Sequence, residues 1–429
     1  MRRVDITRKD MTLRKLRIGQ GKSGGQLTNS LRTCKIALAI IPLYSGSRGD
    51  SVNERQLLEA LSKKICRMIV FSFTPINQIF VGRKRTKKQS NVLLINLPSI
   101  PLPGISLIYS LLLSLLVFLL DKVYKFRFIY IRMSSVAFAF TLFKGLRDKL
   151  IVKIPALLED ELKFKTMFGC FICWLASLLD KVVLRNAAFI ASPSPLLMRE
   201  IIVRRRIIPR GRMIIIPAGV NLEKIYKVKR EIETAEKVRE KGEFVIGFIG
   251  FLSWWQGVDI LVKSVAKLRD IGLDKPVKLL LVGDGPERKR IEDLCMELKV
   301  DYLVTGFVQH DKALKYLSMF DVLVLPSYKI STTESNIPIK VIEAWALGIP
   351  VIVTRHKVFE FYGFKDHEDL VYCEPTPESV AKALAKVLSS MDLREKLSEK
   401  GPQIAKHFNY ELISKKIIDA LKRGNATHG

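Results

Sequence analysis

Short runs of β-branched and other apolar residues alternate with longer amphipathic segments along most of this 429-residue chain. The alternation is typical of parallel α/β architecture, because two parallel strands must be joined by a crossover and the crossover is usually a helix. The strands predicted in the first half are Lys35–Ile41, Met68–Phe73, Val92–Asn96, Arg127–Ile131, Leu150–Ile154, Ala188–Ala191 and Met213–Ile216. Those predicted in the second half are Phe244–Ile249, Val277–Val282, Tyr302–Thr305, Val322–Leu325, Val351–Val353 and Leu370–Tyr372.

A charged stretch that is poor in apolar residues, Asn221 to Glu243, separates the two series of strands. The pattern therefore predicts two Rossmann-like domains in tandem, with a cleft between their carboxyl-edge loops. We expect a basic flexible tail without a signal peptide at 1–33, an N-terminal domain at 34–222 and a linker at 223–242. We expect a C-terminal domain at 243–405, and a last helix at 406–429 that crosses back to the N-terminal domain.

The charge balance limits the classes of partner. The chain has 71 basic and 42 acidic residues, a net charge of +29, which attracts polyanions. The basic residues are spread along the chain without a compact nucleic-acid-binding signature, so an anionic membrane surface and a diphosphate ligand fit better than nucleic acid. Cys170 and Cys173 form a lone C-x-x-C without further zinc ligands, and we expect buried thiols in a reducing cytosol.

One long apolar segment, Ile105 to Leu120, contains no charged residue. Its sixteen residues fall short of the roughly 20 that span a bilayer. The strands predicted before and after it belong to one sheet, and a single membrane crossing would place them on opposite sides of the membrane. We favour a helix packed on the sheet or lying in the membrane interface, with a transmembrane helix as the alternative. A second apolar helix, Met167–Leu179, would extend the same surface.

Three glycine-containing loops follow predicted strands. Gly46, Arg48 and Gly49 come after the first strand and before a helix, where backbone amides and the helix N-terminus favour negative charge. The loop Gly250–Gly257 contains two tryptophans and Gln256, and the third loop contains Gly283 and Asp284, with Pro286 expected at the first helical position. Each loop is either a ligand-lining turn or a structural one.

The fourth loop, Pro326 to Val351, is the most informative. We expect Asn336 to cap a helix that has Pro338 in its first turn and ends at Gly348. Lys340 and Glu343 then share one face of that helix. A helix N-terminus with a lysine for a diphosphate and a glutamate for sugar hydroxyls suits a nucleotide-sugar site. The alternative is a plain surface pair between Lys340 and Glu343.

Five motifs in order resemble the retaining glycosyltransferases of family 4, which have the GT-B fold. Besides the fourth loop they are Ile216–Asn221 (IPAGVN), Gly250–Asp259, Val282–Pro286 (VGDGP) and Gly306–Val308 (GFV). The resemblance covers about Cys34 to Asn409 and is strongest after Ile214. It implies that Glu343 grips the nucleotide ribose, that Gly46–Gly49 faces the donor diphosphate and the acceptor, and that Ser335 to Pro338 lies over the diphosphate and the transferred sugar.

The chain departs from the family pattern at three places. The first glutamate of the family's E-x7-E motif falls at Ser335, with Glu334 one residue out of register. The usual arginine and lysine of the second domain's first loop fall at Phe251 and Gln256, so Lys340, Arg48 and Lys329 are our candidates for neutralising the diphosphate. The common histidine of the first domain is missing, and the polar residues of that region are Arg132, Glu159 and Glu161.

The resemblance implies a retaining glycosyltransferase that moves a sugar from a nucleoside-diphosphate sugar to an acceptor hydroxyl. The basic charge and the two apolar helices suggest that the acceptor is a lipid-linked sugar or a glycan at the cytoplasmic membrane face. The predicted catalytic residues are Lys340, Glu334 and Arg132. The predicted donor-binding residues are Gly46, Arg48, Gly49, Gln256, Gly283, Asp284, Ser335, Asn336, Ile337, Pro338 and Glu343. We expect no metal or other cofactor, because no D-x-D motif stands near a strand end. The alternatives are a non-catalytic nucleotide-sugar-binding protein of the same fold and a nucleotide-sugar epimerase.

Overall fold

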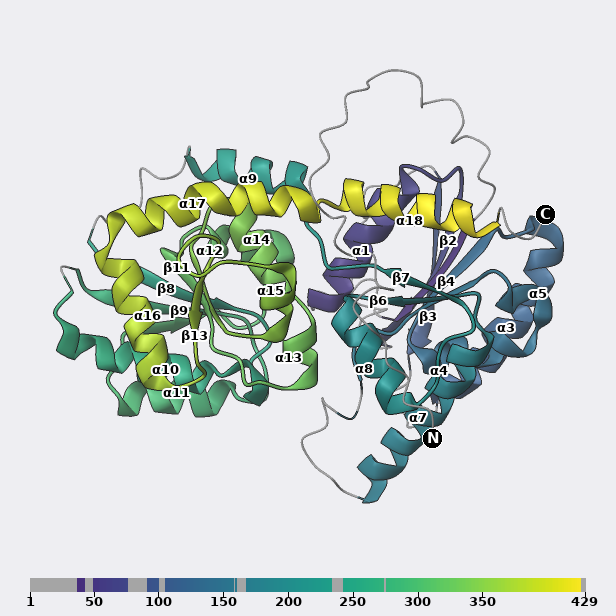
Figure 1. The fold of residues 1–429 in the computed structure, drawn as a ribbon, viewed down its shortest axis with the longest axis horizontal. Helices are drawn as coiled ribbons and strands as arrows, with labels where there is room; N and C mark the ends of the chain where they lie inside the picture. The colour runs from purple at the N-terminus through teal and green to yellow at the C-terminus, as the bar shows by residue number, and fades with distance from the viewer. Residues whose placement is uncertain are drawn as a thin grey trace.

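The computed structural model describes residues 37–42, 49–75, 91–99, 105–157, 159, 167–233, 242–273 and 275–425. They form two domains, each built on a parallel sheet with helices on both faces (Figure 1). All thirteen predicted strands are present, and their ends differ from the prediction by at most three residues. The first sheet contains β1 (Ala37–Pro42), β2 (Met68–Pro75), β3 (Val92–Ser99), β4 (Phe128–Arg132), β5 (Leu150–Lys153), β6 (Phe189–Ser192) and β7 (Arg212–Ile215). The second contains β8 (Phe244–Ile249), β9 (Val277–Val282), β10 (Tyr302–Val304), β11 (Val322–Leu325), β12 (Val351–Thr354) and β13 (Val371–Cys373).

Both sheets have the doubly wound strand order. The first runs β3-β2-β1-β4-β5-β6-β7 and the second β10-β9-β8-β11-β12-β13. In each sheet the order reverses next to the first strand of the domain, between β1 and β4 and between β8 and β11. The carboxyl ends of the strands at such a reversal are where ligands bind in open α/β sheets.

Two helical layers cover the first sheet, and successive buried residues of its strands face opposite layers. Ile129 and Ile131 of β4 belong to the core shared with α3 (Ile105–Tyr124), α7 (Met167–Asn186) and α8 (Pro195–Arg205). Tyr130 faces the opposite core, shared with α1 (Gly49–Ser62) and α18 (Tyr410–Asn425). The smaller α4 (Ser134–Ala137) and α5 (Lys144–Arg147) follow β4. Because successive side chains of a strand point to opposite faces, one strand serves both layers.

The C-terminal domain packs its helices around β8 to β13 in a single core. These helices are α10 (Val258–Lys267), α11 (Arg288–Glu297), α12 (His310–Leu317), α13 (Ser331–Ser335), α14 (Ile339–Leu347), α15 (Lys357–Tyr362), α16 (Pro377–Ser389) and α17 (Met391–Ala405). The segment expected to be a linker with a short helix does begin with one, α9 (Leu222–Glu233), which packs on α12 and α14. Its described part is thus attached to the C-terminal domain.

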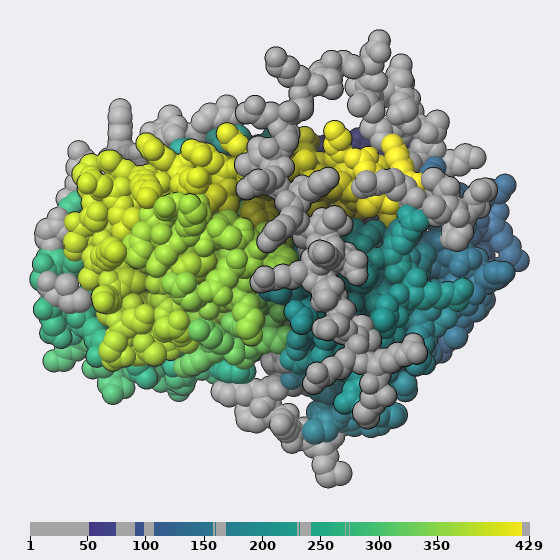
Figure 2. Space-filling view, in the orientation of Figure 1, coloured from purple at the N-terminus to yellow at the C-terminus, as the bar shows by residue number. Residues whose placement is uncertain are grey.

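The last helix connects the two domains. After α17, the chain crosses over, and α18 packs along α1 of the N-terminal domain, where Ile413, Ile417 and Leu421 join the core. In Figure 2 the C-terminal residues form a band that runs across both domains. Tyr410, the first residue of α18, donates a hydrogen bond to Asn53 of α1. The helix therefore fastens the N-terminal domain to the end of the chain.

The apolar segment forms α3, which has one buried and one exposed face. Ser110, Leu113, Ser114 and Val117 are buried against the domain. The opposite face carries a stripe of large apolar side chains that are 42–74% exposed: Ile108, Leu111, Leu112, Leu115, Leu116, Leu119 and Val123. Among the described residues, α3 is the one helix long and apolar enough to span a membrane, over Leu107–Tyr124.

The cysteine prediction is wrong for the C-x-x-C pair. Cys170 is exposed and Cys173 is half-buried, because both lie on the first half of α7, where no described residue before Leu179 is buried. The described residues contain no group of histidine, cysteine or carboxylate side chains arranged for a metal ion.

Candidate functional site

The loops after β8, β9 and β11 meet at the carboxyl edge of the second sheet. Gly283 has φ +145°, and a Cβ there would lie 1.9 Å from the carbonyl oxygen of Gly250. Gly257 has φ +67°, and a Cβ there would lie 2.1 Å from the carbonyl oxygen of Pro326. Only glycine allows the three loops to pack this closely in these backbone conformations. The glycines of the second and third predicted loops are thus needed for the close packing of these loops.

Lys340 reaches from the first turn of α14 into this junction. Its Nζ lies 3.0 Å from Gln256 Oε1 and 4.3 Å from the centre of the Phe248 ring. A Cβ on Gly250 would lie 2.6 Å from the same nitrogen. Burial of the ammonium lowers the pKa of Lys340 to about 7. In the described part of the chain Lys340 forms no ion pair, so this enclosed site favours an added anion.

Glu343 lies one turn further along α14 and is only 4% exposed. Its Oε1 is 2.6 Å from Nε2 of His310, the first residue of α12. On the other side of the ring, His310 Nδ1 lies 3.3 Å from Lys224 Nζ of α9. Lys340 and Glu343 therefore do not form the surface pair that was the alternative interpretation, because each is buried against a different partner.

The loop before α14 differs from the prediction in its capping. Helix α14 begins at Ile339 with Pro338 as its N-cap, at φ −66° and ψ 141°, so Asn336 is not the cap and Pro338 is not in the first turn. The reason is the short helix α13, which ends at Ser335 and is followed by extended backbone at Asn336. Asn336 Nδ2 instead donates to the carbonyl oxygen of Pro155, 3.4 Å away in the N-terminal domain. This residue therefore bridges the two domains.

Glu334, predicted to be catalytic, is engaged within its own domain. His356 Nδ1 lies 3.4 Å from Glu334 Oε1, and Lys357 Nζ lies 2.6 Å from Oε2. The other ring nitrogen of His356 lies 2.8 Å from Ser327 Oγ. Burial lowers the pKa of His356 to about 4 although Glu334 opposes the shift, so its ring is neutral at pH 7. Each oxygen of Glu334 thus already contacts a side chain of its own domain.

Arg132 belongs to a buried charged cluster at the carboxyl ends of β4 and β5. Glu54 of α1 accepts hydrogen bonds from Lys153 Nζ and from the Tyr130 hydroxyl, both at 2.6 Å, and Arg132 Nε lies 3.8 Å away. Burial raises the pKa of Glu54, but the two cations outweigh it and the net shift is downward. Met133, directly after Arg132, has φ +83°, which is strained for a side chain of this size.

The remaining predicted residues lie outside the described residues, stand at a helix end or are paired within their own domain. Gly46 and Arg48 lie outside the described residues, and Gly49 is the first residue of α1. Asp284 stabilises its own turn, since Oδ1 accepts from Gly285 N at 2.8 Å. Pro286 precedes α11 rather than starting it, because that helix begins at Arg288. Two candidate charges are paired within their domains: Lys329 with Glu374 at 2.7 Å, and Glu159 with Arg205 at 2.7 Å.

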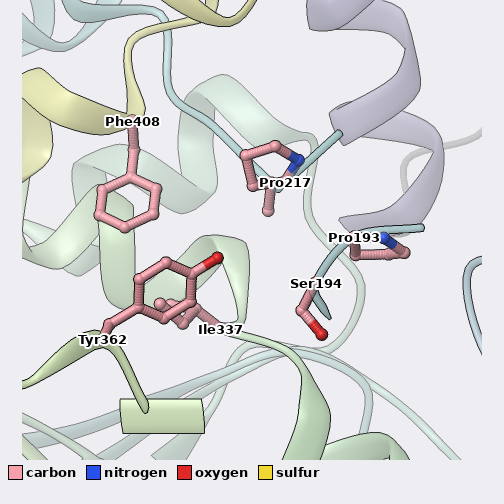
Figure 3. Close-up of a pocket in the computed structure, with 7 residues that line it drawn as sticks. Pro193, Ser194, Pro217, Ile337, Tyr362 and Phe408 are labelled. Atoms are coloured by element: carbon pink, nitrogen blue, oxygen red, sulfur yellow. The ribbon is translucent and has the colours of Figure 1, made fainter. Parts of the chain in front are cut away.

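A small pocket lies where the two domains meet (Figure 3). Ile337, Tyr362 and Phe408 line it from one side, and Pro193, Ser194, Pro217 and Ala218 from the other. Ile337 is therefore the one predicted donor-binding residue in this pocket, next to the loop that carries Asn336. Burial raises the pKa of Tyr362, so its hydroxyl stays protonated and available as a donor.

The C-terminal half matches a known family. Residues 229–404 match the sequence model of the glycosyl transferases group 1. The C-terminal domain belongs to the group 1 glycosyltransferases. Within this group 1 domain lie Gln256, Gly283, Asp284, Glu334, Lys340 and Glu343, whereas Arg132 and Gly49 lie in the other domain.

The group 1 assignment agrees with individual relatives and structures. The D-inositol 3-phosphate glycosyltransferase of Corynebacterium urealyticum is 27% identical over 224 residues, which is 50% of this chain and 51% of that protein. The chain thus spans about half the length of that curated relative. Sucrose-phosphate synthase from Thermosynechococcus elongatus superposes with a TM-score of 0.72 at 20% identity, over 92% of this chain and 100% of that one. The structure of Anabaena HepE with UDP and glucose gives a TM-score of 0.65 at 15% identity, over 91% of this chain and 100% of that one. These similarities show that the fold is GT-B.

Sequence reasoning missed several residues that contact the predicted site residues. His310, His356 and Lys224 are single polar residues at helix starts or on a charged helix, and no motif marks them. Lys153 had a signal, because a lysine inside a predicted buried strand requires an acidic partner. Its partner, Glu54, is 99 residues away, and only the fold brings the two together.

Proposed function

We propose that the chain is a retaining glycosyltransferase that transfers a sugar from a nucleoside-diphosphate sugar to an acceptor hydroxyl. The observation that carries the proposal is the pair of buried groups on α14, Lys340 and Glu343, inside the segment that matches the group 1 family. Their spacing matches the needs of such a donor: a cation for the diphosphate and, one turn away, a carboxylate for the ribose hydroxyls.

The chemical step follows from where charge develops. The bond between the sugar C1 and the phosphate oxygen breaks, and negative charge grows on the leaving diphosphate. Lys340 and the N-terminus of α14, a nine-residue helix, provide fixed positive potential there. The acceptor oxygen bonds to C1 on the same face, and its proton passes to the departing phosphate oxygen. No nucleophile from the protein is required in this route.

The N-terminal domain supplies the acceptor side in this proposal. Asn336 contacts Pro155 across the domain boundary, so the donor loop lies next to the carboxyl end of β5. Arg132 lies at the carboxyl end of the neighbouring strand β4, and its side chain is 11% exposed. We propose that this edge, with α1, binds the acceptor, and that closure of the two domains excludes water.

We further propose that the acceptor is a lipid-linked sugar or glycan at the cytoplasmic membrane face. The exposed stripe on α3 supports this, because monomeric soluble proteins rarely expose so many adjoining apolar side chains. Phe171, Trp174 and Leu178 of α7 are 44–60% exposed and add aromatic side chains suited to a membrane interface. The net charge of +29 adds attraction to anionic lipid. The protein would then bind the membrane peripherally, with α3 in the plane of the interface.

A donor screen tests the transferase proposal. The purified protein is incubated with membrane lipid extract and a panel of UDP-, GDP- and ADP-sugars, and the released nucleoside diphosphate is measured. We expect release from one donor and its loss in Glu343→Ala, with Glu378→Ala as control because Glu378 forms an exposed ion pair with Lys267. Unchanged donor affinity in Glu343→Ala would refute the ribose assignment. Donor binding without release in the presence of extract would favour the non-catalytic binding protein instead.

Flotation with liposomes tests the membrane proposal. Wild-type protein should float with vesicles that contain anionic phosphatidylglycerol, and less so at high salt. Leu112→Glu with Leu116→Glu should abolish flotation, because both charges enter the apolar stripe. Met391→Glu is the matched control, since Met391 of α17 is 65% exposed on the other domain. Equal flotation of both variants would contradict binding through α3.

A further inference from the structure

Three side chains from three different helices form a hydrogen-bonded series beneath the proposed ribose site. Glu343 of α14, His310 of α12 and Lys224 of α9 are 5%, 11% and 31% exposed, respectively. The distances are 2.6 Å from Glu343 Oε1 to His310 Nε2 and 3.3 Å from His310 Nδ1 to Lys224 Nζ. Lys224 also pairs with Asp311, the residue after His310.

The lysine fixes which nitrogen of the ring carries the proton. An ammonium group has three donors and no acceptor, so the imidazole nitrogen that faces it must accept. His310 Nδ1 is therefore the acceptor, and the ring N–H that donates is on Nε2. That N–H points at Glu343 Oε1, at the short distance typical of a hydrogen bond to a charged acceptor. The opposite tautomer would place an N–H against the ammonium and leave Glu343 without a donor.

We propose that His310, with its tautomer set by Lys224, is a positioning residue that aims the carboxylate of Glu343 at the ribose hydroxyls of the donor. The proposal rests on the proposed function, in which Glu343 binds the ribose. One oxygen of the carboxylate is held by His310, and the group is thereby fixed in direction. Among the described residues the other oxygen, Oε2, has no further hydrogen bond, and it is the acceptor for the ribose.

Helices α9 and α12 also make a second polar contact, away from the hydrogen-bonded series. Lys315 of α12 and Glu231 of α9 form an ion pair at 2.9 Å, and both side chains are exposed. This pair joins the same two helices as His310 and Lys224 but lies away from Glu343. It therefore provides a control that loosens α9 against α12 without changing the donor of Glu343.

Two substitutions of the histidine separate positioning from packing. His310→Gln keeps both functions, because an amide NH₂ can donate to Glu343 while the amide oxygen accepts from Lys224. His310→Leu keeps roughly the side-chain volume but removes both the donor to Glu343 and the acceptor for Lys224. Without the Nε2–H, the buried carboxylate loses its fixed direction and can turn toward the released Lys224 ammonium. Lys224→Met removes the group that sets the tautomer and leaves the imidazole in place.

The experiment is calorimetric titration of the full chain with UDP, GDP and their 2′,3′-dideoxy counterparts. A ribose held by an aimed carboxylate should make the wild type prefer the hydroxylated form of its nucleotide by about tenfold or more. His310→Leu should reduce this preference to nearly one, and Lys224→Met should reduce it in part. His310→Gln and Lys315→Met should keep it. Thermal melting of each variant identifies any loss of fold.

The outcomes separate this proposal from the function on which it rests. A wild type that binds none of the four nucleotides overturns the donor site and this proposal together. A wild type with the ribose preference, but the same preference in His310→Leu, overturns the role of His310 alone. Loss of the preference in His310→Gln as well as in His310→Leu also refutes it, because a general disturbance of packing would then explain both.

Discussion

The buried ammonium of Lys340 leads to a prediction that combines stability, pH and donor binding. Burial lowers its pKa from 10.5 to about 7, and no acidic side chain of the described chain pairs with it. Between pH 7 and 10.5 the unfolded chain therefore binds one proton more than the folded chain at this residue. Stability of the free protein then rises with pH across that window, because the unfolded state loses the extra proton.

The size of the effect follows from the shift. At about 1.36 kcal/mol per pH unit, the difference between 10.5 and 7 corresponds to at most roughly 5 kcal/mol. Lys340 as a whole residue is only half-buried, so solvent reduces the figure, and we expect about 2 kcal/mol. Lys340→Met should accordingly stabilise the free protein by about 2 kcal/mol at pH 7. The difference in free energy of unfolding between variant and wild type should become smaller as the pH rises. Urea unfolding of both proteins between pH 7 and 9.5 measures this difference.

Donor binding should reverse the shift, since a diphosphate next to the ammonium favours its charged form. An intact nucleoside-diphosphate sugar keeps its own charge across this pH range, so the proton taken up on binding reports on Lys340. With a pKa of about 7, the wild type should take up about 0.9 proton per donor at pH 8 and about 0.1 at pH 6. Calorimetry in buffers of different ionisation enthalpy gives this number directly.

The variants decide whether Lys340 is the group responsible. Lys340→Met should abolish proton uptake at pH 8 and weaken donor binding most at pH 6, where the wild-type ammonium is already charged. Lys329→Met is the matched control, because Lys329 is on the neighbouring loop but is paired with Glu374. Proton uptake of the same size in Lys340→Met and wild type, or none in the wild type, would refute the reasoning.

Two further predictions concern the N-terminal domain. In urea titrations, Glu54→Gln should lower the free energy of unfolding by about 3 kcal/mol, because it leaves Lys153 and Arg132 buried without their anion. Adding Lys153→Met should recover much of this loss, and a loss below about 1 kcal/mol in Glu54→Gln would contradict a tightly coupled cluster. Met133→Gly should raise the free energy of unfolding by about 1 kcal/mol, because glycine adopts φ +83° without strain and Met133 is 42% exposed. A fall in the melting temperature would show that packing of the Met133 side chain contributes more than the backbone strain costs.

Much of the fold was predictable because its signals are local. Each strand is a short β-branched run, and Gly348 ends α14 in the left-handed conformation, at φ +78°, as its sequence position indicates. The errors occur where a tertiary contact overrides a local sequence preference. Asn336 is a good helix cap by residue type, but the extra turn of α13 places it against Pro155 of the other domain. Glu334 is next to the position of a family glutamate, but it faces His356 and Lys357.

The site could be predicted only in part, because the sequence does not show how its charges are arranged in space. The loop after β8 has Phe251 and Gln256 where the family's usual arginine and lysine fall, so that loop contributes two cations fewer. In the structure, however, the Nζ of Lys340 lies 3.0 Å from the side-chain oxygen of that same Gln256. A cation is therefore present beside the β8 loop, carried by α14, which is 84 residues away in the sequence. Because phosphate recognition depends on where a charge lies and not on which loop carries it, we expect Lys340 to supply the potential that the missing lysine would have given. The same argument predicts that Gln256→Lys would place two ammonium groups side by side, and it should therefore weaken the free protein's stability rather than improve its donor site.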